Sequence, residues 1–166
     1  TQRQPGGAGA ALAVLVGGLG NLAAIEAIRV GYKGLGDPYA FYSITFFSIQ
    51  SYGLIVALAV AWRNRADFHK RLMLLSSAAI LEAAVGRIPL AIIAEQAPLS
   101  FYAGSDLVIA AGIAWDLATR RRIHPVWIWG GGALVASQVL RVAIMHSRPW
   151  LDFVHAVAAF YWPEAR

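Results

Sequence analysis

Six polar side chains interrupt stretches of the sequence that are otherwise apolar, and they are the residues best suited to chemistry inside a membrane. They are Glu82, Arg87, Asp106, Asp116, Gln138 and Arg141. A charge near the centre of a bilayer is costly, so these side chains should face the interior of a helical bundle and find partners there. Such a cluster could hold a polar or anionic headgroup or relay protons. The alternative is that they form interhelical ion pairs that fix the bundle.

Three of these charges fall at the same depth in the outer half of the membrane. At about 1.5 Å per residue, Arg87, Asp106 and Arg141 each lie roughly 8–12 Å below the outer surface. We therefore expect Asp106 to pair with Arg87 or with Arg141, in a pocket that opens outward. Gln138 shares a helix face with Arg141 and should line this pocket. Glu82 should lie at its base.

Two histidines, His69 and His124, are the candidates for holding a haem or a metal. Both fall at the cytoplasmic boundary of the membrane, whereas His146 and His155 lie at the outer side. A haem held by two histidines needs both at matched depth, so this pair could bind near the inner surface; ordinary solvation at the interface is the competing interpretation. The chain has no cysteine and no His-x-x-x-His or Glu-x-x-His motif, which argues against a catalytic zinc site. We predict no catalytic residue.

Long apolar segments must position these side chains. Of 166 residues, 58% are hydrophobic and 14% are charged, whereas a soluble domain carries about 25% charged residues. The apolar residues form runs of about 20, long enough for a helix to cross the hydrocarbon core. We predict a single all-α domain, a transmembrane bundle of about five helices with a C-terminal interfacial helix. The predicted spans are about 7–28, 40–62, 71–94, 99–118 and 126–145, and the interfacial helix is about 151–162.

Basic residues in the connecting loops predict the orientation of the bundle. On one face they are Arg3, Arg63, Arg65, Lys70, Arg71, Arg120, Arg121 and Arg122. Cytoplasmic loops are enriched in Lys and Arg, so this face should be cytoplasmic, with the N-terminus of the chain inside and the C-terminus outside a bacterial cytoplasmic membrane. Asp116 should lie near the cytoplasmic end of its span. These loops account for the net charge of +5, and we expect no nucleic-acid binding.

The segment from Asp67 to Leu75 resembles a motif, His-(Lys/Arg)-Arg-Leu-Met-Leu, that opens a helix in a family of uncharacterised bacterial multi-pass membrane proteins. The resemblance covers about residues 60–155 and continues through Gly86–Pro89, Asp106–Leu107, Trp115–Leu117, Arg122–Pro125, Trp129–Gly131 and Ser137–Arg141. The motif is also locally similar to small membrane proteins linked to haem–copper oxidase assembly. Neither resemblance implies an established activity.

The start of the chain bears on the haem question. It begins at Thr1 and lacks the order of a signal peptide, so we expect it to be the C-terminal part of a longer protein. Members of the resembled family usually have further helices upstream, with a His-rich helix start. The resemblance therefore implies that a haem partner for His69 lies in upstream sequence.

Short loops and the lack of a catalytic constellation favour a protein without catalytic activity of its own, an accessory or assembly subunit of a larger membrane complex. Its partners would be membrane lipids and other membrane protein subunits. Two alternatives stay open. One is a membrane redox protein that handles haem or quinone, with His69 and His124 as ligands. The other is a small transporter or lipid-binding protein that uses the intramembrane polar pocket.

Overall fold

The computed structural model describes residues 4–31, 36–86, 88 and 91–163, and the regular structure in these residues is entirely helical. The longer helices are α1 (Gln4–Val30), α2 (Pro38–Ala61), α3 (Ala66–Ala79), α6 (Ala103–Arg120), α7 (Gly132–Ile144) and α8 (Arg148–Tyr161). The shorter ones are α4 (Glu82–Val85), α5 (Ala91–Glu95), the 3₁₀ turn η1 (Leu99–Tyr102) and the π-helical segment η2 (Val126–Gly131). The predicted all-α class is confirmed.

Within these described residues, four helical segments are long and apolar enough to cross a membrane. They are Ala11–Val30, Pro38–Ala61, Leu99–Arg120 and Val126–Ile144. They correspond to the first, second, fourth and fifth predicted spans, with boundaries that differ by a few residues. The protein is therefore a membrane-embedded helical protein, as the hydropathy of the sequence predicts.

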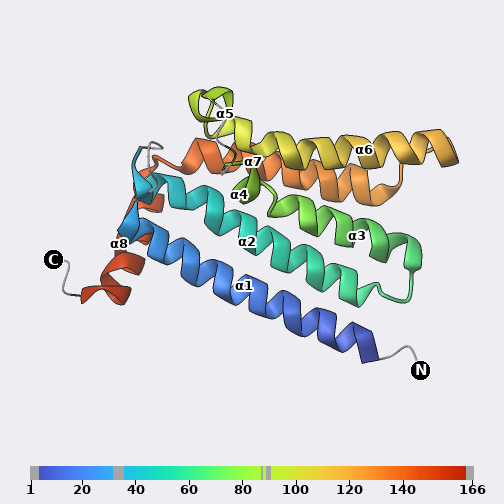
Figure 1. Cartoon of the computed structure of the whole chain (residues 1–166), viewed down its shortest axis with the longest axis horizontal. Coiled ribbons are helices and arrows are strands. Elements are labelled where there is room, and N and C mark those ends of the chain that lie inside the picture. Colours follow the sequence, from blue (N-terminus) through green and yellow to red (C-terminus); the bar gives the residue numbers. More distant parts are fainter. Residues whose placement is uncertain (1–3, 32–35, 87, 89–90, 164–166) are drawn as a thin grey trace.

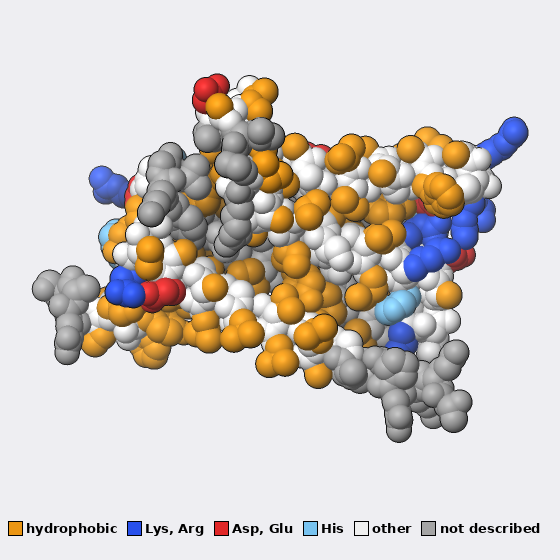
Figure 2. All heavy atoms as spheres, viewed as in Figure 1, with side chains coloured by type: hydrophobic (Ala, Val, Ile, Leu, Met, Phe, Trp, Pro, Cys, Tyr) orange, Lys and Arg blue, Asp and Glu red, His pale blue; other side chains and the backbone are white. Residues whose placement is uncertain are grey.

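The long helices run side by side along the long axis of the molecule (Figure 1). α3 lies among α2, α6 and η2, whereas α1 lies at the edge of the bundle and packs along α2. The α2–α3 and α6–η2 connections lie at one end, on the right in Figure 1, and α5 and α8 lie at the other. We call these the basic end and the α8 end. Lys and Arg side chains gather at the basic end, and hydrophobic side chains cover much of the face between the two ends (Figure 2).

The third predicted span, 71–94, is not one continuous helix in the structure. α3 begins earlier, at Ala66, and ends at Ala79. The N–H groups of Ile80 and Leu81 bond to the carbonyl groups three residues back, at 3.4 and 3.1 Å, which tightens the last turn and ends the helix. α4 then has only four residues. The prediction of a continuous span was wrong because the sequence stays apolar across the break, so hydropathy does not detect it.

The largest cluster of buried hydrophobic residues in the described part of the chain lies around α3. There α2, α3, α6, η2 and α7 contribute buried side chains to one cluster, which includes Leu75 and Trp127. A β-carbon at Gly112 of α6 would overlap the Trp127 ring, and one at Gly130 would lie 2.7 Å from Leu75 Cδ2. Glycine at these two positions therefore lets α6 and α3 approach η2 closely.

The helix α8 packs across the α8 end of the bundle. Its buried side chains recur every four residues, at Trp150, Val154 and Ala158, as expected for one face of a helix. The Trp150 Nε1–H group donates to the Tyr39 carbonyl oxygen of α2 at 3.2 Å. The predicted helix was about 151–162. α8 begins three residues before that range and ends one residue before its end.

Candidate functional site

A buried ion pair joins α4 to α7 inside the bundle. Arg141 Nη1 donates to both carboxylate oxygens of Glu82, at 3.1 and 3.2 Å, and the two residues are only 1% and 4% exposed. Serine hydroxyl groups accept further bonds from the guanidinium: Nη1 also donates to Ser48 at 2.7 Å, and Nη2 donates to Ser51 at 3.1 Å and to Ser137 at 3.0 Å. The buried Nε–H group has no hydrogen-bond partner among the described residues. We call Glu82 and Arg141 the cavity pair, because Glu82 also lines the cavity described below.

Helical spacing brings these groups together. Ser48 and Ser51 are three residues apart on α2, and Ser137 and Arg141 are four apart on α7, so each couple lies on one helix face. Glu82 is the first residue of α4, directly after the break that ends α3. The break therefore sets the direction from which the carboxylate approaches Arg141.

The predicted pairing of Arg141 with Asp106 is wrong. Asp106 Oδ1 instead accepts from the Gln138 side-chain amide at 3.0 Å, and the same amide donates to Ser105 at 2.9 Å. Glu82, the first residue of α4 after the break, takes the place beside Arg141 that Asp106 was expected to occupy. Depth alone therefore does not decide the partner; the direction of each side chain around its helix does.

Arg87, the other predicted partner of Asp106, lies outside the described residues. Gln138 and Arg141 do share a helix face, as predicted from their spacing, and both are buried. They nevertheless reach different neighbours, Gln138 toward α6 and Arg141 toward α2 and α4. The single predicted cluster is therefore two adjacent ones.

A second buried ion pair lies near the basic end, between Arg71 of α3 and Asp116 of α6. Arg71 Nε donates to Asp116 Oδ2 at 2.9 Å, and Nη2 donates to Oδ1. The backbone N–H of His124 donates to Asp116 Oδ2 at 3.3 Å. Asp67 extends the network, with Arg71 at 3.5 Å and Arg120 at 2.9 Å. We call Arg71 and Asp116 the basic-end pair; it ties two helices and a connection together.

The two candidate haem ligands make different hydrogen bonds. His69 Nδ1 lies 2.8 Å from the Ala59 carbonyl oxygen, so Nδ1 carries the proton and Nε2 has a free lone pair. His124 Nδ1 accepts from the Val126 N–H at 3.3 Å, which places its proton on Nε2. As they stand, only His69 presents a lone pair for a metal. Within the described residues there is no group of three His, Cys, Asp or Glu side chains able to hold a metal ion.

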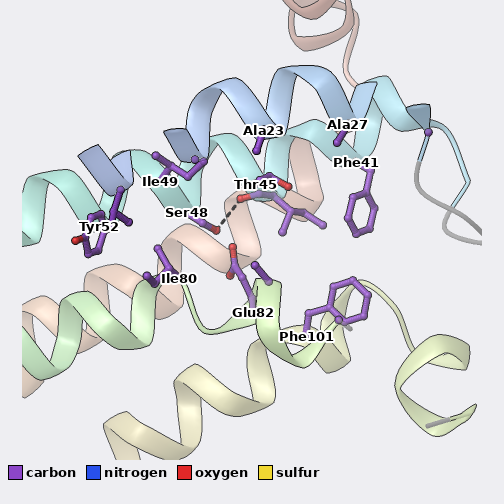
Figure 3. A pocket seen from close by; sticks show the side chains of 17 residues that line it. Ala23, Ala27, Phe41, Thr45, Ser48, Ile49, Tyr52, Ile80, Glu82 and Phe101 are labelled. Atoms are coloured by element: carbon purple, nitrogen blue, oxygen red, sulfur yellow. Dashed lines mark hydrogen bonds between the residues drawn. The ribbon is translucent and has the colours of Figure 1, made fainter. Parts of the chain in front are cut away.

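A cavity of about 510 Å³ opens between α1, α2 and α4. Its α1 wall is made mostly of small residues: Val16, Gly20, Ala23, Ala24 and Ala27, with Gly31 just past the end of the helix. In Figure 3 the Glu82 carboxylate rises from α4 toward Ser48 of α2, and Ala23 and Ala27 lie opposite, on α1. Phe41 and Phe101 line the end nearer α8, with ring centroids 5.8 Å apart.

The cavity differs from the predicted pocket in its position. Glu82 lines it, in agreement with the expectation of a carboxylate at the base of a pocket. In contrast, Asp106, Gln138 and Arg141 are not among the described residues that line it. The pocket thus faces α1 and not the space between α6 and α7.

Several residues of the site were not predicted. Ser48 and Ser51 are ordinary small residues in an apolar span, so nothing in the sequence marks them as partners of an arginine. The α1 wall did carry a signal, since Gly20, Ala23, Ala24 and Ala27 place small side chains on one helix face. Such a face allows either close helix packing or a hollow, and only the structure distinguishes them.

No protein-family model, curated protein or solved structure matches this sequence. Function must therefore be argued from the two ion pairs and the cavity.

Proposed function

We propose that this protein is a small transporter or lipid-binding protein whose binding site is the cavity between α1, α2 and α4. One observation carries the proposal: a buried carboxylate, Glu82, lines a cavity whose walls are otherwise mainly apolar. Ligand sites have this composition, a mostly apolar wall with a few polar groups that fix the orientation of the ligand. The volume of about 510 Å³ falls in the range of about 300–1,000 Å³ for such sites.

The cavity pair is better explained by binding than by stability. Desolvating two charges costs about as much as their attraction returns, so a buried ion pair adds little net stability. Ionisable residues inside a membrane are expensive and mark sites of function more often than not. Protein interiors are also close-packed, with few voids larger than a water molecule. A cavity beside such a pair therefore supports a bound ligand.

The shape of the cavity supports an elongated ligand. Its α1 wall extends from Val16 to Ala27, and eleven residues of helix rise by about 16 Å. α1 packs along α2 and makes no comparably extensive contact with another described element. The side of the cavity between α1 and α4 is therefore the route by which a molecule could enter from the bilayer.

The placement of the bundle in the membrane belongs to the same proposal. The α3–α4–α5 segment crosses as a broken helix and makes the fifth span, and α8 lies in the outer interface with Phe153 and Phe160 exposed. Broken helices occur at membrane depth where they are buried in protein or line a cavity, and α4 does so. The basic end faces the cytoplasm of a bacterium, so the chain enters from inside and ends outside.

The binding test uses two photoactivatable long-chain probes, an alcohol and its methyl ether, with the protein in lipid nanodiscs. Labelled peptides should map to α1, α2 and α4 for at least one probe. Ala27→Phe fills the cavity and should lower that labelling about tenfold. This is the factor that a loss of about 1.4 kcal/mol in the free energy of binding gives. Ala11→Phe is the matched control on an exposed part of α1. Equal labelling of wild type and Ala27→Phe by both probes would refute the proposal.

A specific surface favours a second candidate, an accessory or assembly subunit of a membrane complex. Four leucines of α1, Leu12, Leu15, Leu19 and Leu22, are 55–64% exposed. Their spacing of three and four residues is that of a helix-packing seam, and a helix of another subunit fits it as well as lipid does. Mass spectrometry of the protein released from native membranes in mild detergent tests this candidate. A chain that runs alone would remove it.

The haem and quinone alternative has less support from the geometry. In the described part of the chain, no histidine lines the cavity, and His124 holds its proton on the nitrogen that a metal would need. Haem binding by His69 would therefore need a ligand from another segment. An absorption spectrum of the protein as isolated from its membrane, without a Soret band, would remove the haem version.

A further inference from the structure

The cavity presents a hydrogen-bond acceptor at its middle. Among the described residues, both oxygens of Glu82 receive their bonds from a single nitrogen, Arg141 Nη1, whereas a carboxylate has about four lone-pair sites. The neighbouring Ser48 hydroxyl is already engaged, since it donates to the Ile44 carbonyl at 2.7 Å and accepts from Arg141. Glu82 therefore keeps acceptor capacity on the side that faces the cavity (Figure 3).

The charge of Glu82 is already balanced. Arg141 lies directly behind the carboxylate and is itself buried, 1% exposed. A cationic ligand would add a net positive charge to the interior, which is costly in a membrane. A ligand headgroup that only accepts hydrogen bonds would place its lone pairs against those of the carboxylate. The remaining match is a neutral group that donates.

Apolar surface lies on both sides of this acceptor. Toward the α8 end the wall includes Phe41 and Phe101, and toward the basic end it includes Ile49 and Ile80. A hydrocarbon chain along α1 would cover this surface, and burial of apolar area is the main source of affinity at such a site.

We infer that the cavity binds a neutral amphiphile whose hydroxyl or amide N–H group donates a hydrogen bond to Glu82 and whose hydrocarbon chain lies along α1. This inference rests on the proposed function of the cavity as a binding site. It adds the class of ligand: a long-chain alcohol or a lipid with a free hydroxyl or amide, rather than an ester, a ketone or a lipid amine.

The test compares three probes with the same chain, oleyl alcohol, its methyl ether and oleylamine, as competitors of a photoactivatable lipid in nanodiscs. The alcohol should compete at a concentration about tenfold or more below that of the ether, the difference expected for a hydrogen bond to a charged acceptor. Oleylamine, which is protonated at neutral pH, should compete less well than the alcohol.

Glu82→Gln supplies the variant test. The carboxamide offers both a donor and an acceptor, so the preference for alcohol over ether should fall to within about threefold, a coupling of less than 1 kcal/mol. Asp116→Asn is the matched control, because it removes the same charge from the other buried arginine pair, outside the cavity. It should leave the preference unchanged. The wild-type comparison needs no variant, so it stands even if Glu82→Gln does not fold.

The outcomes separate this inference from the proposed function. If alcohol and ether compete equally in wild type, and Ala27→Phe abolishes both, then the cavity binds a chain and the donor assignment is wrong. If the amine competes best, the neutrality argument is wrong. If Ala27→Phe changes no probe, the cavity is not a binding site and both proposals fail.

Discussion

The two buried arginine–carboxylate pairs have the same chemistry and different surroundings. At the basic end, Arg71 and Asp116 bond through two parallel contacts, and the carboxylate also receives the His124 N–H. In the cavity pair, one nitrogen of Arg141 serves both oxygens of Glu82. Nη2 of Arg141 donates to two serines, and the carboxylate borders a cavity. The Asp116 carboxylate thus receives three hydrogen bonds from three nitrogen donors, and the Glu82 carboxylate receives two from one nitrogen.

This difference separates a structural pair from a site. A two-point arginine–carboxylate contact adds geometric specificity as well as energy, and at the basic end it joins α3, α6 and the connection to η2. The cavity pair leaves an acceptor facing empty space, which is an arrangement that a ligand completes. Identity and burial of the residues are nearly the same in the two pairs, so neither property alone indicates function.

The largest effect should come from breaking the cavity pair on one side only. Glu82→Leu leaves the Arg141 charge unpaired and buried, and we expect a loss of about 3–5 kcal/mol in the free energy of unfolding. Glu82→Leu combined with Arg141→Leu removes both charges and should regain most of that loss. Tryptophan fluorescence during unfolding in SDS from mixed micelles measures both. A double variant as unstable as the single one would show that the pair is structural.

Breaking the basic-end pair should cost less. Asp116→Asn leaves Arg71 with Asp67 still beside it at 3.5 Å, so we expect a loss of about 2–3 kcal/mol. Amide hydrogen exchange should rise at the basic ends of α3 and α6 and stay unchanged around the cavity. Exchange that rises around the cavity would mean that the two pairs are coupled.

The packing next to the basic-end pair should be intolerant of added volume. Gly112→Ala places a methyl group on the Trp127 ring and should lower the free energy of unfolding by about 1–2 kcal/mol. Gly132→Ala is the control, because its β-carbon would meet no atom within 4 Å. It should be neutral or stabilising, since alanine is the better helix former. If both variants behave alike, the close contact between α6 and η2 is not what holds this region.

The smallest effect concerns pH. Hydrogen bonds from Arg120 and Lys70 hold the pKa of Asp67 well below its usual range. A carboxyl with a lowered folded-state pKa adds stability above its unfolded pKa of about 3.9, and this contribution is lost as the pH falls below that value. Because Asp67 is exposed, the effect should be slight. Asp67→Asn should flatten the decline in thermal stability between about pH 5 and pH 2; an unchanged slope would contradict this assignment.

The sequence predicts the helices of this protein better than it predicts the site. The Asp37-Pro38 start of α2 is an example: the Asp37 carboxylate accepts from the Tyr39 N–H at 2.9 Å, and Pro38 occupies the first turn, a capping arrangement that residue types alone indicate. Of the predicted polar cluster, Glu82, Gln138 and Arg141 are buried together as expected. The expected Arg141–Asp106 alternative was wrong, because depth in the membrane does not determine which way a side chain points around its helix, and Arg141 reaches Glu82 instead.

Amino-acid types alone determined that the chain is apolar, helical and membrane-embedded, since the free energy of transfer to lipid is a sum over each segment and needs no neighbour. They also indicated that Glu82, Asp116, Gln138 and Arg141 are buried with partners. They did not indicate that Asp106, predicted to face the interior, is exposed, or that Arg71, predicted among the basic loop residues, is buried. Only the tertiary structure decided which carboxylate meets which arginine, where α3 ends, and that the small residues of α1 border a hollow. Those outcomes depend on how helices are placed and rotated against one another, and that placement is a property of the whole bundle.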